Sequence, residues 1–173
     1  MAAKIKTHLL WLPLLVILLA ACAKTTYYSN IENINPTTGD ERYKIFLQPR
    51  FMDYGLENAS LRRFILTVMN HSDKDLRVVW KDTHFILNGD DKSGFVFSDT
   101  NPKFRHVPKT PSVVSPGRRL REDLFPAGYA SYRIAWDYRT LPKGELGVLV
   151  SMQIEGETIT ELLTLLHDTN IKK

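Results

Sequence analysis

The feature that most constrains the fold is a series of short segments in which apolar and polar side chains alternate. In the clearest of them, near the C-terminus, every second residue is apolar: Leu146, Val148, Val150, Met152 and Ile154. Successive side chains of a β-strand point to opposite faces of a sheet, so this period predicts a strand with one buried face. Glu155-Gly156 then predicts a tight turn into a second strand over residues 158–166.

Similar segments, rich in β-branched and aromatic residues, recur upstream and are separated by turns. They predict strands over residues 43–51, 61–70, 76–80, 85–87 and 94–97. Short polar side chains, which bond their own backbone, predict turns at residues 70–75 and 88–91. Seven to nine strands with turns every 8–12 residues are typical of an antiparallel β-sandwich, so we expect an all-β chain and no doubly wound α/β fold.

The secondary structure of two segments is less clear from the alternation alone. Residues 158–166 also fit helical spacing, through Ile159, Leu162, Leu163 and Leu166, but the preceding turn and three threonines favour a strand. Residues 102–126 contain five prolines. Because proline cannot donate to a ladder of hydrogen bonds, this density predicts a long, stiff connection across the sandwich and no central strand.

The N-terminus has the layout of a secretory signal peptide. Lys4 and Lys6 precede thirteen uncharged residues, 9–21. A bilayer-spanning helix needs about 20 apolar residues, so this stretch is too short for a permanent span. The only cysteine of the chain, Cys22, follows directly. One cysteine excludes an internal disulfide and any multi-cysteine metal site.

Leu19-Ala20-Ala21-Cys22 resembles the lipobox at which bacterial lipoproteins are cleaved and acylated. The resemblance implies that residues 1–21 are removed, that Cys22 carries palmitate-type acyl chains, and that the mature chain is a lipoprotein anchored in a membrane of the cell envelope. In lipoproteins of enterobacterial type an Asp after the cysteine favours the inner membrane, so Ala23 favours the outer membrane. A plain signal peptide with a chance cysteine, or a buried free cysteine, is the alternative.

The predicted organisation is a signal peptide (1–21), a lipidated N-terminus and flexible tether (22–41), a β-sandwich domain (42–167) and a short tail (168–173). The tether is polar, and Tyr27, Tyr28 and Ile31 are the side chains in it that could dock on the domain. The formal net charge of +4 falls to +2 once Lys4 and Lys6 are removed with the signal. This weak charge and the export signal argue against a nucleic-acid partner.

Residues 70–76, Trp80, Phe85 and 111–117 together resemble immunoglobulin-like bacterial surface lipoproteins of unassigned role. The shared theme is a strand, an Asn-x-Ser turn, a strand with a tryptophan, and a crossover framed by prolines. The resemblance implies an immunoglobulin-like β-sandwich in the cell envelope and carries no catalytic residue.

No motif in the chain indicates catalysis or a cofactor. The histidines of the mature chain show no metal-ligand spacing and are His71, His84, His106 and His167. There is no Gly-x-Ser-x-Gly elbow, no phosphate-binding loop and no EF-hand spacing. We therefore expect no enzyme, metal or cofactor, with a catalytic site assembled from distant residues as the third alternative.

One surface feature stands out, a segment over residues 103–121 that is rich in cations. Its candidate anion- or glycan-binding residues are Lys103, Arg105, Lys109, Arg118, Arg119 and Arg121, with Tyr138 as the expected exposed aromatic. Arginine binds phosphate and carboxylate through paired hydrogen bonds, so the segment suits lipid headgroups, phosphorylated glycolipid or acidic glycan. The alternative is a solvated edge whose charges discourage aggregation.

Two functions remain after these exclusions. The leading hypothesis is a non-enzymatic envelope module that binds or scaffolds an envelope protein, including as an accessory subunit of an envelope assembly. The alternative is a glycan- or glycolipid-binding module that uses residues 103–121.

Overall fold

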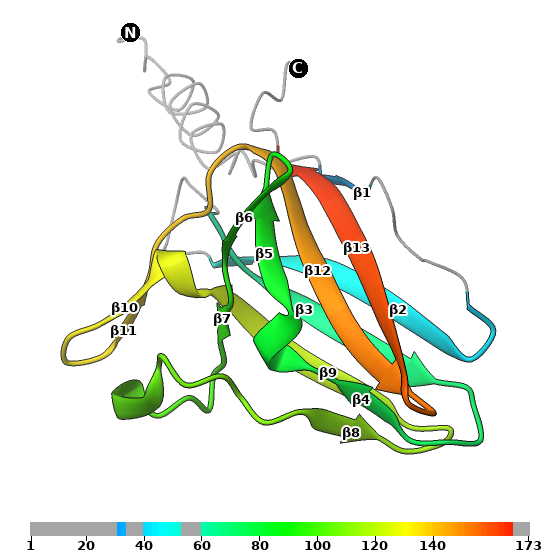
Figure 1. Ribbon diagram of the computed structural model, residues 1–173. Coiled ribbons are helices and arrows are strands. Elements are labelled where there is room, and N and C mark those ends of the chain that lie inside the picture. The colour runs from blue at the N-terminus through cyan, green and yellow to red at the C-terminus, as the bar shows by residue number, and fades with distance from the viewer. Residues whose placement is uncertain (1–30, 34–39, 53–59, 168–173) are drawn as a thin grey trace, which may run out of the picture.

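The computed structural model describes residues 31–33, 40–52 and 60–167, and the predictions for the signal peptide, Cys22 and residues 168–173 lie outside these ranges. The described chain is all-β and built from antiparallel strands, and its two larger sheets face each other as in a β-sandwich (Figure 1). No helix within these ranges is long and apolar enough to cross a membrane.

The larger sheet, sheet A, centres on the hairpin predicted near the C-terminus. Its strands run in the order β1 (Ile31–Asn33), β13 (Glu157–His167), β12 (Gly144–Ile154), β4 (Leu76–Val78) and β8 (Ser112–Val114). Two further strands extend it, since β5 (His84–Leu87) pairs with β12 and β6 (Asp90–Ser93) pairs with β5.

The second sheet, sheet B, packs against sheet A. Its order is β2 (Tyr43–Met52), β3 (Ser60–Asn70), β9 (Arg119–Pro126) and β7 (Phe95–Val96). A separate two-stranded hairpin consists of β10 (Ala130–Tyr132) and β11 (Trp136–Tyr138). Three short 3-10 helices complete the described chain: η2 (Trp80–Asp82), η3 (Pro102–Phe104) and η4 (Ala127–Tyr129).

The core lies between the two sheets and is filled by alternate residues of the facing strands. Phe85 of β5 is fully buried, and the centroid of its ring lies 6.1 Å from that of Phe64 and 5.8 Å from that of Tyr129. Val148 pairs with Leu163 across the β12–β13 ladder, and both are buried. Removal of this apolar surface from water is the main stabilising contribution.

A buried asparagine ties the end of β3 to sheet A. Asn70 is 1% exposed, and its Nδ2 donates to the carbonyl oxygens of Val114 (2.7 Å) and Lys74 (2.6 Å). Its Oδ1 accepts from the backbone N–H (3.0 Å) and the hydroxyl (2.8 Å) of Ser72. The side chain therefore builds the predicted turn after β3 and joins it to β8.

The structure confirms the predicted strands over residues 43–51, 61–70 and 85–87, and it confirms strand for residues 158–166. The ladder with β12 is continuous from Gly144–His167 to Ile154–Glu157, and it places Leu163 and Leu165 in the core. Trp80 is buried, but β4 ends at Val78 and the tryptophan opens η2.

The prediction that residues 102–126 contain no central strand is wrong for their last third. β9 lies between β3 and β7 in the interior of sheet B. The prolines are confined to the preceding loop, to the flanks of β8 and to the last position of β9, Pro126. The proline density of residues 102–126 as a whole does not apply to the eight residues of β9, because only the last of them, Pro126, lacks an N–H donor.

Part of the segment predicted as a tether belongs to sheet A. β1 pairs with the end of β13, with Ile31 opposite His167. The backbone of Ile31 therefore lies against the domain, and Ile31 is one of the three tether residues predicted to be able to dock. The described chain enters the sandwich at the His167 end of β13.

Candidate anion-binding face

The candidate site is the face of sheet B that points away from the core. On β2 the core receives Tyr43, Ile45 and Leu47, and on β3 it receives Leu66 and Val68. The residues between them point outward. With their neighbours on β9 they form what we call the outer face: Lys44, Phe46, Gln48, Arg50, Arg63, Ile65, Thr67, Met69, Arg119, Arg121 and Asp123.

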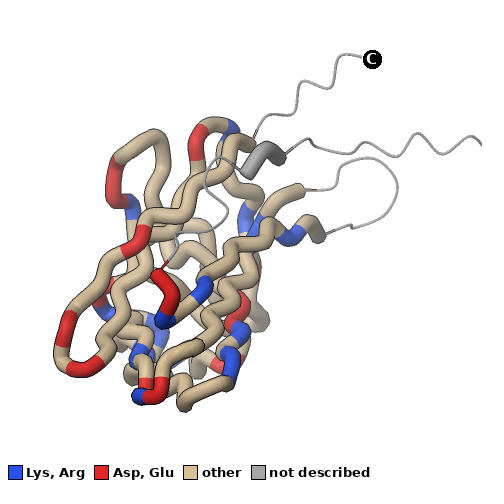
Figure 2. The backbone as a smooth tube through the Cα atoms, turned by 90° about the vertical axis from the view of Figure 1, so that its right-hand side faces the viewer, with Lys and Arg blue, Asp and Glu red and all other residues tan. Residues whose placement is uncertain are grey.

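The outer face carries an excess of positive charge. Its cations are Lys44, Arg50, Arg63, Arg119 and Arg121, and Asp123 is its one acid. Figure 2 shows basic segments along the strands on the right-hand side, where sheet B lies, and acidic segments at several turns. Arg50 stands directly opposite Arg63 in the register. Like charges in that position destabilise a sheet, so folding stability does not explain their placement.

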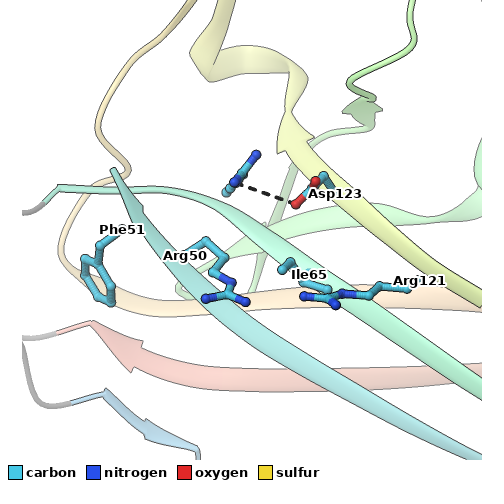
Figure 3. A pocket seen from close by; sticks show the side chains of 6 residues that line it. Arg50, Phe51, Ile65, Arg121 and Asp123 are labelled. Atoms are coloured by element: carbon cyan, nitrogen blue, oxygen red, sulfur yellow. Dashed lines mark ion pairs between the residues drawn. The ribbon is translucent and has the colours of Figure 1, made fainter. Parts of the chain in front are cut away.

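Two adjacent hollows lie on this face. One, of about 370 Å³, is lined by Arg50, Phe51, Arg63, Ile65, Arg121 and Asp123. The other, of about 350 Å³, is lined by Phe46, Gln48, Thr67, Arg119 and Arg121. Arg121 lines both, so the two hollows adjoin across β2, β3 and β9, and we refer to them together as the groove. In Figure 3 the side chain of Arg121 extends past Ile65 toward the guanidinium group of Arg50.

The one carboxylate in the groove, Asp123, already forms an ion pair with Arg63. Asp123 Oδ1 lies 3.5 Å from Arg63 Nε, the ion pair dashed in Figure 3. Both of these atoms are buried and make no hydrogen bond, so the contact is electrostatic. The guanidinium of Arg63 also lies over the ring of Phe125, 5.5 Å from its centroid. The charges of Arg50 and Arg121 thus face the groove without compensation from its lining.

Aromatic rings continue from the Phe125 end of this face. Tyr138 stacks on Phe125, with 3.9 Å between centroids, and Trp136 stacks on Tyr138 at 6.0 Å. Burial raises the pKa of the Tyr138 hydroxyl, and the charge of Arg63 opposes part of that effect. Tyr138, the aromatic expected to be exposed, is half-buried, and the more exposed apolar residues here are Tyr132 (39%) and Ile134 (95%).

The structure divides the predicted basic segment. Arg119 and Arg121 lie on the outer face. Lys103 and Arg105 lie at η3, and Arg118 lies in the turn between β8 and β9, all three exposed to solvent. Only part of the segment thus contributes to the groove.

Lys109 is neutralised by neighbouring acids. Its Nζ lies 3.0 Å from Glu122 Oε1 and 3.5 Å from Asp99 Oδ2, above the ring of Phe97. These contacts tie the lysine to Glu122 of β9 and to Asp99, so we exclude it from the anion-binding groove.

Three cations of the outer face were missed: Lys44, Arg50 and Arg63. They lie outside the dense basic run, on strands that were predicted for their apolar residues. The sequence pattern that could have identified them is the alternation of apolar and polar residues, because all three occupy solvent-facing positions of β2 or β3.

The histidines occupy separate surroundings. His84 Nδ1 lies 2.9 Å from Asp91 Oδ2, and the buried His167 has Nδ1 2.9 Å from the carbonyl oxygen of Pro142. In the described part of the chain, no three His, Cys, Asp or Glu side chains are grouped so that they could hold a metal ion.

No protein-family model and no curated protein matches this chain. Its function is therefore inferred from the outer face and from the sequence.

Proposed function

We propose that this chain is a lipid-anchored cell-envelope protein whose immunoglobulin-like β-sandwich is a non-enzymatic binding module for an anionic glycan or glycolipid. The lipobox ending in Cys22 supports the anchor, and Ala23 favours the outer membrane. Two antiparallel sheets packed face to face, with Trp80 in the core, support the immunoglobulin-like type. The arginines that line the groove support an anionic ligand.

The observation that carries the proposal is the pair of guanidinium groups, Arg50 and Arg121, that converge on one groove (Figure 3). An arginine fork matches the geometry of phosphate and carboxylate oxygens and donates two hydrogen bonds to them. A bound anion would also relieve the repulsion between Arg50 and Arg63. The apolar side chains of Phe51 and Ile65 supply a surface on which a sugar ring or an acyl-linked headgroup can rest.

The ligand class is tested with purified lipopolysaccharide and with the same material after removal of its phosphates. We expect the mature chain to bind the phosphorylated form more tightly. We also expect its affinity to fall as salt rises from about 0.1 M to about 1 M, because the Debye length shrinks from ~10 Å to ~3 Å. Tighter binding to a carboxylate-rich capsular polysaccharide would assign the groove to acidic glycan. Salt-independent binding, or no binding to any of the three, would reject the proposal.

The anchor is tested by Cys22→Ala. We expect the wild-type chain to be cleaved before Cys22, to carry acyl groups by mass spectrometry and to fractionate with membranes. The variant should lose both the acyl groups and the cleavage. A Cys22→Ala chain that is processed and membrane-bound like the wild type would contradict a lipid anchor at this residue.

A docking scaffold for an envelope protein is the second candidate, and the edge of sheet B favours it. β2 is ten residues long, and in the described part of the chain its only strand partner is β3. An open edge of this kind can receive a strand from another protein. This function predicts a protein cross-linked to β2 in intact membranes, whose capture does not depend on Arg50 and Arg121.

A further inference from the structure

The hairpin β10–β11 is attached to the sandwich at its base. Arg62 Nη1 donates to the carbonyl oxygen of Tyr138 at 2.6 Å. At the same end of the hairpin, Arg139 donates through its backbone N–H to the carbonyl of Tyr129 (2.8 Å) and through Nη2 to that of Gly128 (2.7 Å). Together with the ring of Tyr138 stacked on Phe125, these contacts fix the base of the hairpin.

The tip of this hairpin exposes apolar side chains to solvent. Ile134 is 95% exposed, the highest value among the large apolar residues of the described chain. Tyr132 is 39% exposed and meets the ring of Trp136 edge-on at 5.4 Å. Figure 1 shows the hairpin extending away from both sheets. Scattered exposed apolar residues are ordinary, but here one is presented at the end of a supported projection.

The composition of the hairpin matches a membrane interface. An aliphatic side chain at the tip can enter the acyl region, while tyrosine and tryptophan rings favour the headgroup level. Arg133 lies beside Ile134 at the tip, Arg139 lies at the base, and Asp137 is the only acid in residues 130–139. Cations beside an inserted apolar residue add attraction to anionic headgroups.

The predicted anchor enters the domain at the same end of the sandwich as this hairpin. Ile31, the first described residue, pairs with His167. His167 in turn contacts the carbonyl of Pro142, in the segment that leaves β11. Only residues 23–30 separate Ile31 from Cys22. Eight residues span at most about 30 Å, so an acyl chain on Cys22 would hold the bilayer within that distance of β1.

We propose that the tip of β10–β11, centred on Ile134, inserts into the lipid leaflet that holds the acyl anchor. This inference rests on the anchor at Cys22 in the proposed function. A leaflet fits better than a protein partner, because a specific protein interface buries about 800 Å² on each side and the tip offers one aliphatic side chain and ring edges. A tethered domain needs only a weak second contact, since the tether makes that contact intramolecular.

Tryptophan fluorescence tests the insertion in the full chain purified from membranes and reconstituted into vesicles. Cleavage before Cys22 leaves two tryptophans, Trp136 in the hairpin and Trp80, which is 4% exposed in the core. We expect emission to be quenched in vesicles of brominated phosphatidylcholine and phosphatidylglycerol relative to unbrominated ones. Trp136→Phe should abolish this difference, and Ile134→Ser should remove most of it. Val107→Ser, at an apolar residue that is 63% exposed on another loop, is the matched control and should leave it unchanged.

Equal emission in both vesicles, or full quenching in Ile134→Ser, would overturn the insertion. Mass spectrometry of Cys22 on the same sample separates this result from failure of the anchor. An acylated chain without bromine quenching overturns the hairpin contact alone. Quenching in a chain without an acyl group supports the hairpin contact and overturns the anchor.

Discussion

Phe85→Ala is expected to lower the free energy of unfolding by about 3–5 kcal/mol, because it leaves a cavity where the two sheets meet. Phe85 is fully buried, and its ring lies between those of Phe64 and Tyr129. Both neighbours are held by strands or by η4, so they can fill the space only in part. Urea unfolding followed by circular dichroism measures the loss.

Phe104→Ala is the matched control for this substitution. Phe104 is 60% exposed at the end of η3, so its removal should change the unfolding free energy by less than about 0.5 kcal/mol. Equal losses in the two variants would contradict the location of the core between β5 and β3.

Asn70→Ala is expected to cost about 3 kcal/mol, because a buried polar group left without its partner costs about 1–3 kcal/mol. The substitution removes the hydrogen bonds that the asparagine side chain makes with the carbonyl of Val114 and the N–H of Ser72, while the carbonyl of Lys74 keeps the Ser72 hydroxyl as a donor. The same unfolding experiment applies, and we also expect the β3–β4 turn to lose protection from amide exchange.

Asn101→Ala provides the comparison. Asn101 is exposed, and its Oδ1 accepts one bond from the backbone N–H of Lys103 at the start of η3. Loss of that cap should cost about 0.5–1 kcal/mol. If Asn70→Ala cost no more than Asn101→Ala, the buried asparagine would not be the link between sheet B and β8.

The strands that could be predicted from sequence are those whose burial alternates without interruption. In β12 every second side chain from Leu146 to Ile154 enters the core, and the same period sets the register with β13. β9 was missed because its apolar positions, among them Leu120 and Leu124, are separated by charges and preceded by prolines. Its place beside β3 depends on pairing between distant segments, which no local pattern encodes.

The candidate site was predicted in part for a related reason. The prediction rested on the number of cations within residues 103–121. Cations that are close together in sequence do not necessarily lie on one surface. Arg119 and Arg121 share a groove with Arg50, which is about 70 residues away in sequence. The sheet brings them together by aligning β2, β3 and β9, so the common phase of the three strands was the useful signal.

The central claim, that the groove on the outer face binds an anion, is tested most directly by the affinity of Arg50→Gln/Arg121→Gln for purified lipopolysaccharide. The matched control is Lys103→Gln/Arg105→Gln, which removes the same formal charge from the exposed loop at η3. Hydrogen bonds to charged groups contribute about 1.5–3 kcal/mol each, so we predict that the groove variant binds more than about tenfold more weakly. The control should stay within about twofold of the wild type, as expected for screened charges that make no direct contact. Equal weakening in the two variants, or unchanged binding by the groove variant, would contradict the account.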